Sequence, residues 1–110
     1  MLTKANRINT QGDFRRTMNK GKRVNSANLF ITIRPTKDEA TRFGFVVSKV
    51  VGNAVARNLV KRRLREIAAE VIAEFPTGID AVVRPGATSI NASFDELRTE
   101  VFAAVRRAVR

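Results

Sequence analysis

Residues 28–34 alternate between the two faces of a predicted β-strand. Leu29, Ile31 and Ile33 fall on one face, whereas Phe30 and Thr32 fall on the other. The polar residues 35–41 predict a turn after this strand, so we expect the next strand to return antiparallel to it. Residues 22–25 form a shorter extended segment before it.

Residues 42–51 form the next predicted strand, and its two faces differ in character. One face is apolar and consists of Phe43, Phe45 and Val47, and the other consists of Gly44, Val46 and Ser48. The second face continues the mixed face that carries Phe30 and Thr32. We expect a short helix to cover half of this combined face and to leave half open. A short apolar strand is also predicted at residues 79–84.

Apolar residues spaced three and four apart predict a long helix at residues 54–74. Asn53 is a favourable N-cap after Gly52, and no proline follows until Pro76. The face expected to lie against the core consists of Val60, Leu64, Ile67 and Val71, bordered by Ala56 and Ala68.

Two shorter helices are predicted near the ends of the chain. The first begins at Thr10, has Asp13 in the position of a capping box and stops at Gly21. The second begins at Ser93, with Glu96 as its capping-box partner, and continues to the C-terminus. The elements follow the order α-β-β-β-α-β-α, which predicts an α+β fold with a single mixed sheet and helices packed on it.

Length and composition narrow the class of protein. The 110 residues suffice for one compact domain, so we interpret 1–110 as a single domain in which residues 1–9, with few side chains to bury, form a flexible basic arm. The absence of cysteine and histidine excludes disulfides, the usual zinc sites and Ser-His or Cys-His nucleophiles. Without an apolar run long enough to cross a membrane or a signal-peptide core, we expect a cytoplasmic protein with no membrane partner.

Positive charge is concentrated in the first part of the chain. The formal net charge is +11, and residues 1–65 hold 16 basic and 3 acidic side chains, whereas residues 66–110 hold 5 and 7. A small basic domain most often binds nucleic acid, with an anionic membrane as the lesser alternative. We therefore expect the partner to meet the first two-thirds of the chain.

The charges of the long helix run against its dipole. Arg57, Lys61 and Arg65 form a stripe near its N-terminus, with Asn58 and Arg62 beside it, and the acidic residues come later. A helix dipole favours the opposite order, and like charges four residues apart repel. Phosphate groups of a polyanion would compensate this cost at the first helical amides and along the stripe. A solvated basic face is the equally weighted alternative.

Three groups of residues resemble the signature of the bacterial ribonuclease P protein subunit. They are the segment 43–49 (FGFVVSK), the segment 52–58 (GNAVARN), and the cations Lys61, Arg62 and Arg65 that follow. The resemblance implies a protein that assists a catalytic RNA in removing the 5′ leader from precursor tRNA. It also implies that the RNA holds the active site and its Mg²⁺ ions, that the protein alone does not cleave, and that a left-handed β-α-β crossover surrounds the long helix.

The same resemblance assigns two groups of binding residues. Contacts to the catalytic RNA fall on Lys49, Arg57, Asn58, Lys61, Arg62 and Arg65. The cleft for the single-stranded leader falls on Phe14, Met18, Phe30 and Thr32. Leu59 and Val50 stand where cations are common in the family, and Met18 and Thr32 stand where aromatic residues are frequent. We therefore expect electrostatic contacts to carry a larger share of leader binding here.

Two other classes of protein are alternatives to a ribonuclease P subunit. A structural RNA-binding protein or RNA chaperone is equally compatible with the charge and the fold class. An autonomous metal-dependent nuclease is not favoured, because Asp13, Asp38 and Glu39 are the only acids before residue 66 and their spacing does not resemble a paired-metal site.

Overall fold

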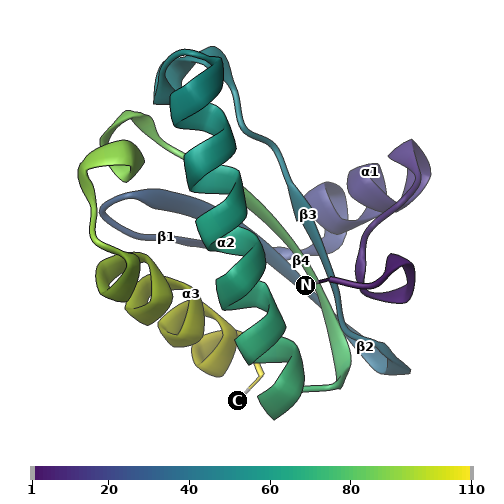
Figure 1. The fold of residues 1–110 in the computed structure, drawn as a ribbon. Helices are drawn as coiled ribbons and strands as arrows, with labels where there is room; N and C mark the ends of the chain where they lie inside the picture. Colours follow the sequence, from purple (N-terminus) through teal and green to yellow (C-terminus); the bar gives the residue numbers. More distant parts are fainter. Residues whose placement is uncertain (1, 110) are drawn as a thin grey trace.

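The computed structural model describes residues 2–109, which form a four-stranded sheet with helices on both faces (Figure 1). The α-helices are α1 (Gln11–Lys20), α2 (Ala54–Glu74) and α3 (Phe94–Ala108). The strands are β1 (Lys22–Asn25), β2 (Leu29–Ala40), β3 (Arg42–Phe45) and β4 (Thr77–Pro85). Three short 3₁₀ turns are η1 (Lys4–Asn6), η2 (Lys49–Val51) and η3 (Ala87–Asn91). The predicted α+β class with a mixed sheet is confirmed.

The strands lie in the order β1-β2-β4-β3, with β3 parallel to β4 and the other neighbours antiparallel. The prediction of a turn at residues 35–41 is wrong, because β2 continues to Ala40 and pairs there with Thr77 of β4. β3 does return antiparallel to β2, but β4 lies between them. Pairing with β4 at Pro35 and at Ala40 thus extends β2 through this polar segment, and the register shifts between these two residues.

The prediction of a strand through residue 51 is also wrong in length. β3 ends at Phe45, and the chain leaves the sheet to form η2 before α2 begins. The two faces nevertheless have the predicted character, because Phe43 is 1% exposed in the core and Gly44 lies against α1.

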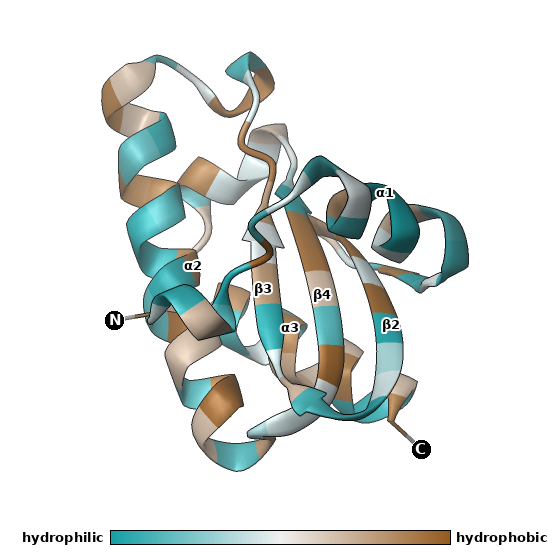
Figure 2. Ribbon diagram, turned by 90° about the vertical axis from the view of Figure 1, so that its right-hand side faces the viewer, coloured by the Kyte–Doolittle hydropathy of each residue, from teal (hydrophilic) through white to brown (hydrophobic). Residues whose placement is uncertain are grey.

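The helices form a layer on each side of the sheet (Figure 2). α2 and α3 pack against one face, and α1 packs against the other. The core lies between the sheet and the α2/α3 layer, and it includes the predicted helix residues Val60, Leu64, Ile67 and Val71 together with Leu29, Ile31 and Ile33 of β2. The chain passes from β3 through α2 to the parallel strand β4, and the left-handedness implied for this crossover stays a prediction.

Part of the predicted basic arm packs against the domain. Leu2 and Ile8 are buried, and the Ile8 amide donates a hydrogen bond of 3.0 Å to the Phe43 carbonyl. The expectation that this segment has few side chains to bury is therefore wrong for these two residues. Met1 lies outside the described residues.

Among residues 2–109, no helix is both long and apolar enough to cross a membrane.

Candidate nucleic-acid interface

The turn before α2 aims the helix N-terminus out of the sheet. Gly52 has φ +145°, a conformation that side chains strongly disfavour, and a Cβ atom there would lie 2.9 Å from the Cβ of Ala56. The Asn53 side chain then accepts a hydrogen bond of 2.9 Å from the Ala56 amide, as its predicted N-cap role requires. Glycine and asparagine together fix the start of the cationic helix.

The four predicted contact cations of α2 reach solvent without acidic partners among the described residues, whereas the fifth cation, Arg63, donates to the Ala92 carbonyl. Arg57 and Lys61 are half-buried, and Arg62 and Arg65 are exposed. Within residues 2–109, none of these four cations forms a salt bridge, and the first turn of α2 contains no acid. The N-terminal half of α2 is therefore a surface of uncompensated positive charge.

The acids in the second half of α2 have a separate structural role. Glu70 accepts a hydrogen bond of 2.8 Å from Arg98 of α3, and Glu74 lies 3.5 Å from Arg106 of the same helix. The guanidinium groups of both arginines also lie over the Phe102 ring. The reversed charge order of α2 thus divides the helix into a free cationic half and an acidic half paired with α3.

Two hollows meet along the cationic half of α2. One has a volume of about 260 Å³ and is lined by Val47, Ala54, Arg57, Asn58 and Lys61. The other has a volume of about 170 Å³, and its lining includes Arg7, Phe14, Phe45, Lys61 and Arg65. Lys61 belongs to both. Lys49, on η2, and Arg62 are exposed outside these hollows, so the structure brings together four of the six predicted RNA contacts.

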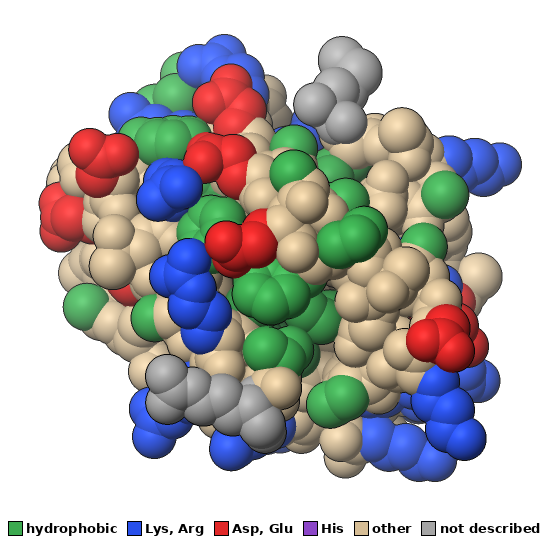
Figure 3. Space-filling view, turned by 90° about the horizontal axis from the view of Figure 1, so that it is seen from below, with side chains coloured by type: hydrophobic (Ala, Val, Ile, Leu, Met, Phe, Trp, Pro, Cys, Tyr) green, Lys and Arg blue, Asp and Glu red, His purple; other side chains and the backbone are tan. Residues whose placement is uncertain are grey.

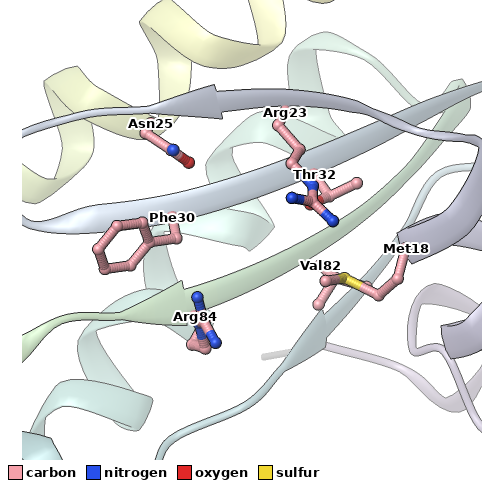
Figure 4. A pocket seen from close by; sticks show the side chains of 7 residues that line it. All are labelled: Met18, Arg23, Asn25, Phe30, Thr32, Val82 and Arg84. Carbon is pink, nitrogen blue, oxygen red and sulfur yellow. The ribbon is translucent and has the colours of Figure 1, made fainter.

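A separate groove lies on the open half of the sheet beside α1 (Figure 4). Its volume is about 310 Å³, and it is lined by Met18, Arg23, Asn25, Phe30, Thr32, Val82 and Arg84. Met18 and Phe30 are 36% and 42% exposed, but Thr32 is only 4% exposed. The predicted half-open face is therefore present, with Met18 at its edge and Phe30 as its accessible aromatic ring.

Phe14 does not line this groove. Its ring packs against Gly44, where a Cβ atom would lie 2.6 Å from two ring carbons, and it contributes to the hollow that contains Lys61 and Arg65. The structure therefore places one of the four predicted cleft residues on the α2 side of α1. The other three, Met18, Phe30 and Thr32, lie together.

The sequence-based prediction missed the two cations of the groove. Arg84 lies directly opposite Phe30 in the sheet register, with its guanidinium carbon 5.1 Å from the centre of the ring. Arg23 lies opposite Thr32 on the other side of β2. Strand alternation along β4 places Arg84 on the same face as Asp80 and Val82. Only the pairing of β4 with β2 brings Arg84 next to Phe30.

A buried ion-pair network joins α1 to the sheet. Asp80 is fully buried and accepts hydrogen bonds from Arg34 at 2.6 Å and from two nitrogens of Arg42 at 2.8 and 3.0 Å. The third nitrogen of Arg42 donates a bond of 3.0 Å to Asp13. The hydrogen bond from Arg42 lowers the pKa of Asp13, and the bond to Asp80 raises the pKa of Arg42.

The face of the molecule seen from below differs in character from these two surfaces. The end of the molecule seen in Figure 3 has hydrophobic side chains at its centre and charges of both signs around them. Among residues 2–109, no group of three acidic, histidine or cysteine side chains is placed to hold a metal ion. The cationic face of α2 and the groove beside α1 are therefore the strongest candidates for binding nucleic acid.

Known proteins resemble this chain along its full length. A family model described as Ribonuclease P matches residues 2–109. The ribonuclease P protein component of Kocuria rhizophila is 44% identical over 110 residues, covering 100% of this chain and 97% of that protein. That of Clavibacter michiganensis is 39% identical and covers 100% and 98%.

Solved structures of ribonuclease P proteins are also similar to this chain. The ribonuclease P protein of Staphylococcus aureus superimposes with a TM-score of 0.80 at 28% identity, covering 96% of each chain. That of Thermotoga maritima gives a TM-score of 0.79 at 27% identity, covering 92% of this chain and 96% of that one.

Proposed function

The chain belongs to the ribonuclease P protein family, and we propose that two surfaces on opposite sides of α1 bind its two RNA partners. The protein is the subunit of a ribonucleoprotein enzyme that processes the 5′ end of tRNA, and the RNA carries the catalysis. In this proposal the cationic half of α2 binds the catalytic RNA, and the groove beside α1 binds the leader of precursor tRNA.

The observation that carries the proposal is that the four predicted RNA-contact cations of α2 lack acidic partners among the described residues. Arg57, Lys61, Arg62 and Arg65 form no salt bridge within residues 2–109, although the chain uses Glu70 and Glu74 of the same helix to bind α3. Phosphate groups would supply the missing negative charge and would also meet the free amides at the start of the helix. We include Lys49 and Asn58 in this contact surface because they flank it.

The groove suits a flexible single strand better than a duplex. Single-stranded nucleic acid is bound by aromatic rings on which bases stack and by cations that follow the backbone. Phe30 offers an exposed ring, and Arg23 and Arg84 stand on the strands at either side of it. Met18 borders the groove from α1, whereas the buried Thr32 forms its floor. Phe14 contributes from the hollow on the far side of α1.

We propose that Mg²⁺ is held mainly by the RNA partner. The described residues offer no cluster of carboxylates for a metal. The net charge of +11 instead suits the protein to neutralising phosphate groups. Its cations reduce the repulsion between the phosphates of the catalytic RNA and of the substrate, which Mg²⁺ otherwise has to screen. We expect the protein to act with precursor tRNA in the cytoplasm.

Reconstitution with the partner RNA tests the proposal. The protein is expected to lower the Mg²⁺ concentration that the RNA needs to cleave leader-bearing tRNA, and to cleave nothing alone. An unchanged Mg²⁺ requirement would contradict the proposal. Equal affinity of the complex for leader-bearing and leaderless tRNA would instead favour a general RNA-binding or RNA-chaperone role.

A further inference from the structure

One row of charged side chains crosses the sheet beneath the first turn of α1. Arg34, Asp80 and Arg42 lie directly opposite one another on β2, β4 and β3. Asp80 is fully buried, and Arg42 holds its carboxylate with two nitrogens, so the guanidinium plane is fixed. The remaining nitrogen of Arg42 points to Asp13 of α1.

We propose that Asp13 and Arg42 are positioning residues for the leader: their ion pair holds α1 in place and thereby sets the groove bordered by Met18. This inference rests on the proposed role of the groove. Neither residue lines the groove, so each acts through the placement of α1.

Besides this ion pair, the half-buried Phe14 holds the N-terminal half of α1, because its ring packs on Gly44 of β3. Among the described residues of the helix, Thr17 alone is buried, and most of the others are polar and exposed. Thr10 caps the helix by accepting a bond from the Asp13 amide, but the Asp13 carboxylate does not accept a bond from the Thr10 amide as a capping box would require. That carboxylate is bound by Arg42 instead, so the expected capping box is replaced by a contact to the sheet.

The C-terminal end of α1 is attached differently. A Cβ atom on Gly21 would lie 2.5 Å from the Thr17 carbonyl oxygen and 2.6 Å from the Cγ2 of Thr32, so the helix end packs tightly on β2. Gly21 stops the helix as predicted, but with φ −79° it does so without a left-handed cap. Met18 lies between this attachment and the ion pair. Loss of the ion pair weakens the attachment of the N-terminal end of α1, which then rests on the packing of Phe14 against Gly44.

Asp13→Asn can distinguish a positioning effect on leader binding from an electrostatic one, because the two effects change the affinity in opposite directions. Asp13→Asn removes a negative charge from a protein whose partners are polyanions, so electrostatics alone would strengthen binding. Weaker binding of the leader would therefore indicate that the geometry of the groove has changed. Glu39→Gln is the matched control, because Glu39 is an exposed acid on β2 outside the groove and the α2 surface.

The experiment uses the holoenzyme reconstituted with the catalytic RNA. The affinities for leader-bearing and leaderless tRNA are measured for the wild type and for Asp13→Asn, Asp13→Glu and Glu39→Gln. We expect Asp13→Asn to lower the ratio of the two affinities by about two- to thirtyfold, with unchanged affinity for leaderless tRNA and for the catalytic RNA. Asp13→Glu, which keeps the carboxylate, is expected to recover part of the loss.

A second variant covers the case in which Asp13→Asn does not fold, as judged by circular dichroism. Arg42→Lys keeps a cation beside Asp80 but cannot hold both carboxylates, so it is expected to show the same loss of leader preference. An unchanged ratio in the folded variants would overturn the inference, as would an equal loss for leaderless tRNA. A wild-type holoenzyme without leader preference would instead contradict the proposed role of the groove.

Discussion

The ring of Phe14 lies directly on Gly44, so closely that a Cβ atom on the glycine would stand 2.6 Å from the ring carbons Cε1 and Cζ. This contact joins α1 to β3, and both residues line the hollow that also contains Lys61. A residue without a side chain is therefore needed for α1 to approach the sheet.

Gly44→Ala is expected to destabilise the protein by about 1–3 kcal/mol, because the added methyl group displaces the Phe14 ring from a packed contact. Urea unfolding measures the change. The control is Gly12→Ala, where the new Cβ would lie 3.9 Å from the Thr10 hydroxyl oxygen and the helix favours alanine by about 0.5–1 kcal/mol. Equal stability of the two variants would contradict the tight contact at Gly44.

Asp80→Asn is expected to lower the free energy of unfolding by about 3–5 kcal/mol. The substitution leaves Arg34 and Arg42, each about four-fifths buried, without the carboxylate that compensates them. Asp38→Asn, an exposed acid on β2, should change stability by less than about 0.5 kcal/mol. A loss for Asp80→Asn as small as that of the control would show that the buried network contributes little.

The Asp13–Arg42 pair predicts a defined pH dependence. The pKa of Asp13 lies below its usual value of 3.8 in the folded protein, so the stabilisation is fully present above the unfolded-state pKa and is lost as the pH falls through the folded-state pKa. The difference in unfolding free energy between the wild type and Asp13→Asn should thus be constant above about pH 5 and shrink below 3.8. A difference that grows on acidification would contradict the ion pair.

Arg57→Ala and Arg65→Ala should each weaken binding to the catalytic RNA and make it less sensitive to salt. Removal of one phosphate contact lowers the slope of log K against log salt concentration by about 0.7–0.9. Titrations at several salt concentrations measure this slope. Arg107→Ala, on the exposed end of α3, serves as the control for loss of one charge elsewhere. Equal slopes for all three variants would reduce the α2 stripe to a solvated basic face.

Phe30→Ala should weaken binding of leader-bearing tRNA by about 1–3 kcal/mol if one base stacks on the ring. Affinity for leaderless tRNA should not change, and Phe30→Tyr should retain most of the binding because it keeps an aromatic surface. The measurement is the affinity of the reconstituted holoenzyme for both RNAs. An Ala variant with full leader preference would remove stacking on Phe30 from the proposed mode of binding.

Local signals predicted the helices well. Asn53 and the periodic apolar residues placed α2 at Ala54–Glu74, and both hydrogen bonds of the Ser93–Glu96 capping box are present at the start of α3. These features depend on residues within a few positions of one another. At Thr10 the same reasoning was only half right, because the distant Arg42 binds the Asp13 carboxylate.

The sequence predicted those parts of the candidate site that depend on residues close together in the chain. The stripe of Arg57, Lys61 and Arg65 follows from helical spacing alone, and the open face with Phe30 follows from strand alternation. The contribution of Arg23 and Arg84 and the separation of Phe14 from Met18 could not be predicted this way. They depend on which strands are neighbours and on the side of α1 that faces each hollow.

Residues close together in the chain were enough to predict the three helices, the inner faces of helices and strands, the cationic half of α2 and the family of the protein, but not the lengths of β2 and β3. The tertiary structure decided that β4 lies between β2 and β3, which carries Asp80 to Arg34 and Arg42 and Arg84 to Phe30. The physical reason is that backbone pairing between distant segments sets the register of a sheet, and register alone determines which side chains meet across it.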